Sequence, residues 1–179
     1  MSPRFTAIEK ARKDAGLTNP YGLMEFWRKD WLHLSNSIPQ FEYDLDHIPE
    51  NVFGVGAIIP DSAPASEIDP DLDKWLNERP TVLVNLGTHF ISDPKFITNM
   101  SKALARTLAS HEDIQVLWKV QCSEEHRSII DELLSLFVKK GRIRVLKWLK
   151  CDPVVLLQTG NIVLSVNHGG GNSFWEGLW

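Results

Sequence analysis

Short apolar segments alternate with longer segments of helical periodicity from residue 71 to the end of the chain. The apolar segments predict strands at residues 81–87, 114–120, 142–149 and 161–166. Helices are predicted at residues 71–78, from Asp93-Pro94 through Leu108, at 124–140, from Asp152-Pro153 to near Gly160, and from Asn172 onward. Strands that alternate with helices of this length pair in parallel through right-handed crossovers. The expected fold class is therefore α/β, with a Rossmann-like parallel sheet covered by helices on both faces.

A proline-rich stretch of small and polar residues precedes this alternating part. Residues 60–70 contain three prolines and resemble a linker in composition. We therefore expect a domain boundary here, between residues 1–59 and residues 71–179. At the end of the stretch, Asp69 and Pro70 are typical of the cap and the first residue of a helix.

Residues 1–59 contain few predicted elements. Apolar residues after Phe5 have a loose helical spacing that ends at Gly16. A second apolar stretch, residues 21–34, carries Trp27 and Trp31 four positions apart, which suits one face of a helix. Residues 51–59 predict a short strand. This part of the chain is expected to be the end of a domain rather than a domain of its own.

Composition excludes several classes of function. The formal net charge is -4, and the pI of about 5.8 argues against binding to nucleic acid or an anionic membrane, which requires a basic surface. No run of 18 apolar residues predicts a membrane span, and the N-terminal residues lack the apolar stretch of a secretory signal. Two cysteines, Cys122 and Cys151, make neither a disulfide framework nor a zinc site. A reducing, cytoplasmic location is expected.

Three polar or aromatic residues lie at or just after predicted strand ends. Thr88 and His168 come just after the first and fourth predicted strands, and Trp148 lies at the end of the third. In open parallel sheets, ligands bind beyond the carboxyl ends of the strands. These residues are therefore the first candidates for a binding site.

The strongest local motif follows the last predicted strand and reads His168-Gly169-Gly170-Gly171-Asn172-Ser173-Phe174-Trp175-Glu176-Gly177. It combines a glycine turn with the start of a helix. Glycines let backbone amides approach a ligand closely, and a helix N-terminus presents free N–H groups and partial positive charge to a phosphate. Glu176, one turn into the helix, is suited to accept hydrogen bonds from a ribose diol. The alternative is a plain glycine turn with Asn172 as a helix cap.

This motif resembles the donor-binding signature of the UDP-dependent glycosyltransferases (family 1, GT-B fold), H-x-G-x-N-S-x-x-E. Trp148 resembles the tryptophan that opens the family's signature, although Leu149-Lys150-Cys151 departs from the Pro-Gln that follows it in the family. Residues 82–88 resemble the first strand of the family's C-terminal domain. Weaker similarities at Asn36-Ser37-x-Pro39 and at residues 48–56 resemble the last part of the acceptor domain.

The resemblance implies transfer of a sugar from a UDP-sugar to an acceptor hydroxyl with inversion, without a cofactor or a tightly bound metal. The donor-binding residues that it implies are Thr88, Trp148, His168, Gly169, Gly170, Gly171, Asn172, Ser173 and Glu176. Trp148 would stack on the uracil, and Glu176 would hold the ribose hydroxyls. His168, Asn172, Ser173, Thr88 and the glycine amides would hold the diphosphate. The acceptor is expected to be a small molecule of unknown identity.

Two parts of the family pattern are not found. The Asp/Glu-Gln pair that holds the sugar would come after the glycine turn, and the catalytic histidine would come early in the acceptor domain. We assign no catalytic residue in this chain, since neither His33, His47 nor His89 can be identified as the base. The chain is expected to be a truncated enzyme, an incomplete C-terminal half of a GT-B fold with residues 71–179 as its UDP-sugar-binding domain and residues 1–59 as the tail of the acceptor domain. We expect it to be poorly soluble and inactive alone.

Two alternatives stay open. The first is a non-catalytic nucleotide-binding module, which would bind UDP without turnover. The second is an esterase, because His168-Gly169-Gly170-Gly171 also resembles an esterase oxyanion-hole motif; however, no G-x-S-x-G nucleophile elbow occurs in the sequence.

Overall fold

The computed structural model describes residues 3–16, 30–38, 44–88, 90 and 92–178. The chain divides into two compact units, residues 1–56 and residues 57–179. No described helix is long and apolar enough to cross a bilayer.

The first unit contains one helix and a pair of short parallel strands. Helix α1 spans Pro3–Asp14, as the sequence predicts, and the chain turns at Gly16 with a φ of 78°. Strands β1 (His33–Ser35) and β2 (Val52–Gly54) pair in parallel. The prediction of a helix over residues 21–34 is wrong at its end, where β1 begins, and residues 21–29 lie outside the described part. The strand predicted at residues 51–59 is shorter in the structure, where β2 ends at Gly54, because Gly56 takes a φ of 76° that interrupts the extended backbone.

The proline-rich stretch, residues 60–70, belongs to the second unit and is partly helical. Helix α2 spans Ala65–Ile68, and Ala65 is buried among apolar residues of the second unit. Helix α3 (Pro70–Leu76) follows, and the Asp69 carboxylate accepts a hydrogen bond from the Leu72 amide at 3.3 Å. The cap and the first helical residue predicted from the sequence are thus confirmed. Residues 65–70 do not form the open linker that their composition suggests, because Ala65 and Ile68 pack against the apolar core.

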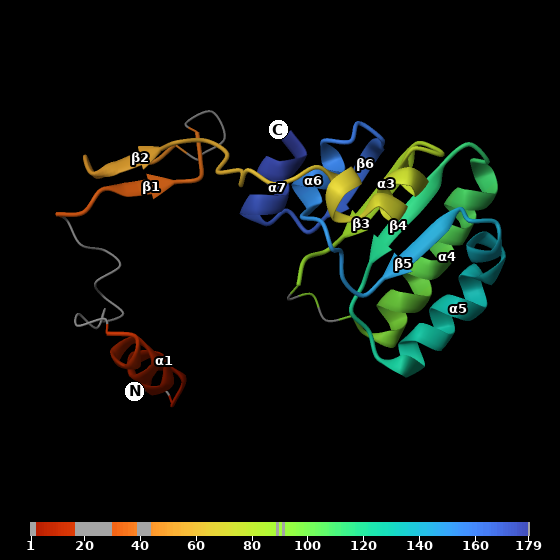
Figure 1. The fold of residues 1–179 in the computed structure, drawn as a ribbon, viewed down its shortest axis with the longest axis horizontal. Coiled ribbons are helices and arrows are strands. Elements are labelled where there is room, and N and C mark those ends of the chain that lie inside the picture. The colour runs from red at the N-terminus through yellow and green to blue at the C-terminus, as the bar shows by residue number, and fades with distance from the viewer. Residues whose placement is uncertain (1–2, 17–29, 39–43, 89, 91, 179) are drawn as a thin grey trace. The chain divides into compact units, whose positions relative to one another are not determined.

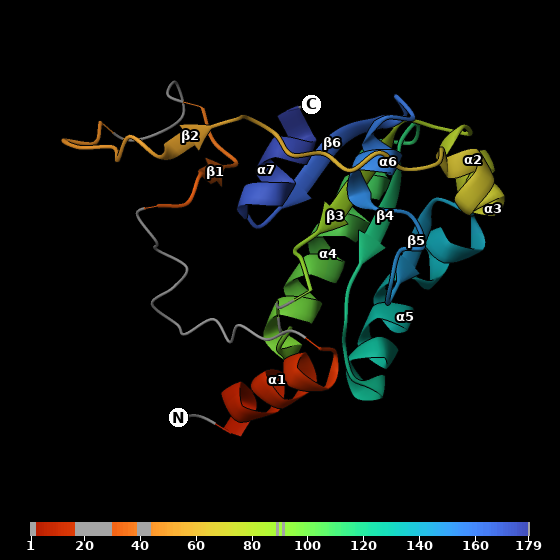
Figure 2. The same ribbon diagram turned by 60° about the vertical axis from the view of Figure 1, so that its left-hand side comes forward.

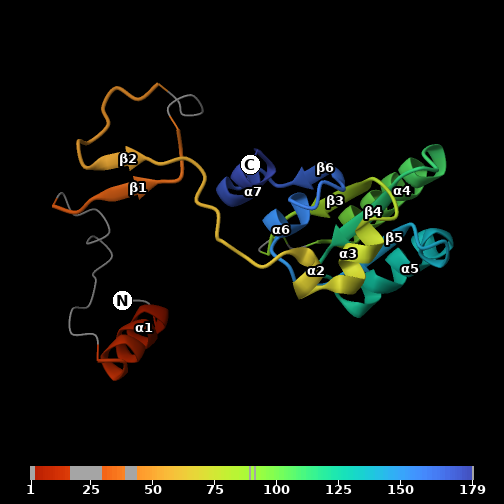
Figure 3. The same cartoon turned by 45° about the horizontal axis from the view of Figure 1, so that its top comes forward.

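The second unit is built on a parallel four-stranded sheet with the order β5-β4-β3-β6 (Figures 1 and 2). The strands are β3 (Thr81–Asn85), β4 (Gln115–Lys119), β5 (Ile143–Leu146) and β6 (Ile162–Asn167). The helices between and after them are α4 (Pro94–Ser110), α5 (Glu124–Lys139), α6 (Pro153–Leu157) and α7 (Gly171–Leu178), the last of which follows β6 directly (Figure 3). The Rossmann-like α/β fold expected from the sequence is confirmed.

Two apolar clusters cover the two faces of this sheet. On one face, Val82, Val116 and Trp118 pack against residues of α4 and α5. On the other face, Leu83 and Leu117 pack against residues of α2, α3 and α6. Alternate residues of β3 and β4 therefore serve opposite clusters, as expected for strands buried on both faces.

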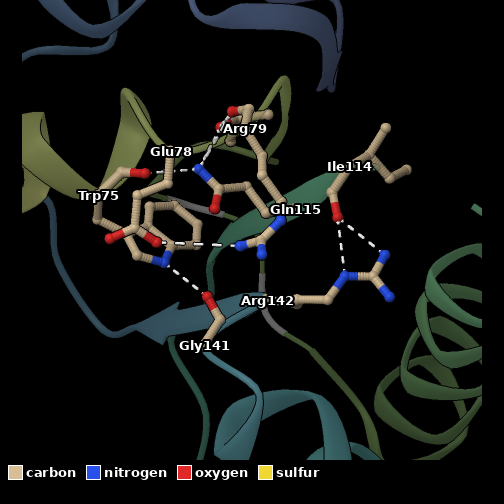
Figure 4. A network of polar contacts seen from close by, with 8 residues as sticks. Trp75, Glu78, Arg79, Ile114, Gln115, Gly141 and Arg142 are labelled. Carbon is tan, nitrogen blue, oxygen red and sulfur yellow. Dashed lines mark hydrogen bonds and ion pairs between the residues drawn. The ribbon is translucent and has the colours of Figure 1, made fainter. Parts of the chain in front are cut away.

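Buried polar side chains connect the elements near the amino ends of the strands (Figure 4). Gln115 Nε2 donates to the carbonyl oxygens of Trp75 and Arg79. The buried Arg142 guanidinium donates to the Ile114 and Leu108 carbonyls and also to that of His111. This end of the sheet is therefore closed by internal hydrogen bonds.

The outer part of β6 and the end of α7 expose apolar side chains. Val163 and Leu164 are 60% and 54% exposed, and Leu178 is 56% exposed. Trp175 of α7, by contrast, is only 9% exposed. Helix α7 packs against α6 and β6.

Candidate functional site

Strands β3 and β6 are neighbours at the point where the order of the strands reverses. β3, β4 and β5 follow one another across the sheet, whereas β6 returns to the free side of β3. Crevices for ligands form at such a switch point, beyond the carboxyl ends of the two strands. A cleft of about 780 Å³ lies there and is lined by residues that follow β3, β5 and β6.

The two strands end with the same local turn. Asn85 and Asn167 are register partners in the last position of β3 and β6. The Asn85 side-chain oxygen accepts from the Gly87 amide at 3.2 Å, and that of Asn167 accepts from the Gly169 amide at 2.9 Å. Gly87 and Gly169 have φ angles of 84° and 70°, which glycine adopts without strain. These turns lead both chains away from the sheet at the cleft.

The imidazole of His168 is held between two glycines. A β-carbon on Gly87 would lie 2.9 Å from Cε1 of His168, and one on Gly170 would clash with the Nε2 side of the ring. Both positions therefore require glycine for the ring to stay in place. His168 itself is exposed to solvent and lines the cleft.

Helix α7 begins at the cleft. Its first hydrogen bond runs from the Phe174 amide to the Gly170 carbonyl at 2.9 Å. The amides of Gly171, Asn172 and Ser173 come before this bond and have no partner within the helix. All three residues line the cleft, so the partially positive end of α7 borders it.

Two carboxylates also line the cleft. Burial raises the pKa of Glu176, and the nearby charge of Asp152 raises it further. Asp152 is the cap residue of α6, but its side chain makes no capping hydrogen bond. The carboxylate of Glu176 therefore sits in a partly desolvated place at the edge of the cleft.

An exposed indole and a buried lysine form the side of the cleft near β4 and β5. Trp148 is 61% exposed. The Lys119 ammonium lies 5.1 Å from the centroid of the Trp148 ring and donates to the Gly87 carbonyl at 2.9 Å. Burial lowers the pKa of Lys119.

The structure brings together all but one of the site residues predicted from the sequence. Thr88, Trp148, His168, Gly170, Gly171, Asn172, Ser173 and Glu176 line the one cleft. Gly169 does not line it, and its amide is already bonded to Asn167. Its expected contribution of an amide to a ligand is therefore not available in this conformation.

Sequence reasoning missed Lys119, Asn85 and Asn167. The sequence signal for Lys119 was a single cation that directly follows the apolar residues Val116, Leu117 and Trp118. His89, the candidate base nearest to the site in sequence, lies outside the described residues. His33 and His47 belong to the first unit.

One curated relative matches the chain along nearly its whole length. No protein-family profile matches the chain. The chain is 35% identical over 182 aligned positions to glycosyltransferase sdnJ of Sordaria araneosa. The alignment covers 99% of this chain and 36% of that relative. The chain therefore spans a little over a third of the length of the curated relative that it matches.

Proposed function

We propose that this chain, which is homologous to a glycosyltransferase along nearly its whole length, binds the nucleotide of a UDP-sugar donor in the cleft beyond β3 and β6. One observation carries this proposal. Residues from three separate segments, around Thr88, Trp148 and His168, line the same cleft, although 60 positions separate the first two.

Each part of the cleft suits one part of a nucleoside diphosphate. Trp148 offers an exposed aromatic surface for the base, and stacking of this kind contributes about 1–3 kcal/mol. Glu176 offers carboxylate oxygens that accept hydrogen bonds from ribose hydroxyls. His168 and the first amides of α7 offer donors to the phosphates, at a helix terminus whose partial charge favours an anion.

In a whole glycosyltransferase, this site would hold the donor while a sugar passes to an acceptor hydroxyl with inversion. The leaving diphosphate would be stabilised by the donors at the start of α7. This role needs no metal from the residues of the cleft. The acceptor and the catalytic base remain unassigned in this chain.

Calorimetric titration of the 179-residue protein with UDP tests the proposal. We expect saturable binding, and we expect His168→Ala and Glu176→Ala each to weaken it by about 10-fold or more, the loss of a hydrogen bond to a charged group. Lys102→Met, an exposed change on α4 outside the cleft, serves as the control.

The site assignment fails if both variants bind UDP as tightly as the wild type. UDP binding with no transfer from any UDP-sugar would instead favour the non-catalytic nucleotide-binding module over an active transferase. Thermal unfolding of each variant establishes that weaker binding does not reflect loss of the fold.

A further inference from the structure

Lys119 is a buried cation at the cleft to which neither the sequence motifs nor the proposed function gives a role. It is the last residue of β4, a strand whose five residues are all buried, and it is only 6% exposed. Lysine is rarely buried so fully unless its charge is paired. Its position therefore needs a physical explanation.

The contacts of Lys119 leave its charge uncompensated. Its ammonium donates to the Gly87 carbonyl and lies over the Trp148 ring, both of which are uncharged. No carboxylate of the described part of the chain lies within ion-pair distance of it. Burial lowers its pKa, with no opposing effect from a neighbouring acid. A buried, unpaired cation is costly, and an anionic ligand would remove that cost.

The two contacts also place Lys119 between the parts of the proposed nucleotide site. Trp148 follows β5 and would hold the base, whereas Gly87 follows β3 and packs against His168. The ammonium therefore borders the cleft between the base surface and the turn that faces the phosphate donors.

We infer that Lys119 supplies the positive charge that pairs with the diphosphate of the bound nucleotide, an inference that rests on the proposed function. The two carboxylates of the cleft, Asp152 and Glu176, repel a diphosphate, and the free amides of α7 carry only partial charges. A full charge at Lys119 offsets that repulsion.

A positioning role is the rival explanation. Lys119 could act only by fixing the Trp148 ring and the Gly87 turn through the contacts already present. The two roles differ in their dependence on phosphate. A charge that pairs with the diphosphate matters for UDP and not for uridine, whereas a support for the Trp148 ring matters for both.

Calorimetry with UDP, uridine and inorganic pyrophosphate separates these roles. We expect Lys119→Met to weaken UDP and pyrophosphate binding by about 10- to 100-fold and uridine binding by less than about 3-fold. Lys119→Arg keeps the positive charge. Its affinity for UDP is expected to stay within about 5-fold of the wild-type affinity, which is a smaller loss than removal of a charged hydrogen bond causes. Lys102→Met removes one positive charge from an exposed site and should change none of the three affinities.

The possible outcomes are distinct. Equal losses for UDP and uridine, or no loss for either, overturn the inference. If the wild type binds pyrophosphate but not UDP, and Lys119→Met abolishes that binding, the proposed nucleotide function is wrong while the anion-binding role of Lys119 stands. If the wild type binds none of the three probes, both are wrong. If the Lys119→Met protein fails to fold, the wild type is compared with Lys119→Arg, which retains the charge. Loss of UDP binding by this arginine variant contradicts the inference.

Discussion

The His168 imidazole packs so closely against Gly87 that a β-carbon on the glycine would come within 2.9 Å of the ring. Gly170 confines the other side of the same ring. The turns at the ends of the neighbouring strands β3 and β6 thereby fix the orientation of the His168 ring, a candidate hydrogen-bond donor to a phosphate.

Gly170→Ala should displace the His168 ring, because the new methyl group would occupy its place. We expect UDP affinity to fall by about 10-fold, as for loss of a hydrogen bond to a charged group, with little loss of thermal stability. Gly177→Ala is the control: nothing lies within contact of its β-carbon, and replacing a helical glycine should stabilise the protein by about 0.5 kcal/mol. Equal UDP binding by the wild type and Gly170→Ala would contradict the proposed role of the ring.

Trp148→Ala should weaken binding of UDP and uridine by a similar factor, about 10- to 100-fold, because the lost stacking involves the base alone. The side chain is 61% exposed, so unfolding by urea should change little. Phe53→Ala, which removes an exposed aromatic residue of the first unit, provides a matched control. A loss confined to UDP would show that the ring does not hold the base.

Uridine binding should depend on the protonation of Glu176. Its pKa is raised above the ordinary value of 4.5, so the carboxylate is ionised and accepts hydrogen bonds above the raised pKa. As pH falls through that pKa, the carboxyl group becomes protonated and uridine affinity should decrease. Uridine is the better probe here, since phosphates titrate near pH 6.

Two variants test the cause of this pH dependence. Glu176→Gln cannot titrate and should bind uridine with an affinity that does not change over the same acidic range. Asp152→Asn removes the neighbouring charge that raises the pKa of Glu176, so the acidic midpoint should move to lower pH. A midpoint that stays in place in the Asp152→Asn protein would refute the coupling.

Arg142→Met should lower the free energy of unfolding by about 3 kcal/mol, because buried carbonyls at the end of α4 and before β4 would lose their donors. Urea unfolding followed by circular dichroism measures this change. Lys140→Met, an exposed change two residues away, should stay within about 0.5 kcal/mol of the wild type. A change in the free energy of unfolding as small as that of Lys140→Met would show that the hydrogen bonds of Arg142 contribute little to stability.

From α3 onward, the order of helices and strands was predictable from the sequence, because apolar periodicity and helix caps are local signals. Asp93 illustrates this: its side chain accepts from the Phe96 amide at 2.6 Å, and α4 begins at Pro94 as predicted. The strand over residues 142–149 was predicted too long, since β5 ends at Leu146, opposite the end of its partner β4. Strand length depends on the neighbour as well as on composition.

The sequence by itself determined the α/β class, the glycine turn after the last strand and most of the residues of the candidate site. Only the tertiary structure decided that β6 pairs with β3, which places His168 beside Gly87. It alone also revealed the buried charge of Lys119 and the internal hydrogen bond that occupies the Gly169 amide. The physical reason is that side-chain periodicity reports which face of an element is apolar, whereas strand order, burial of a charge and use of an amide depend on residues far apart in the chain.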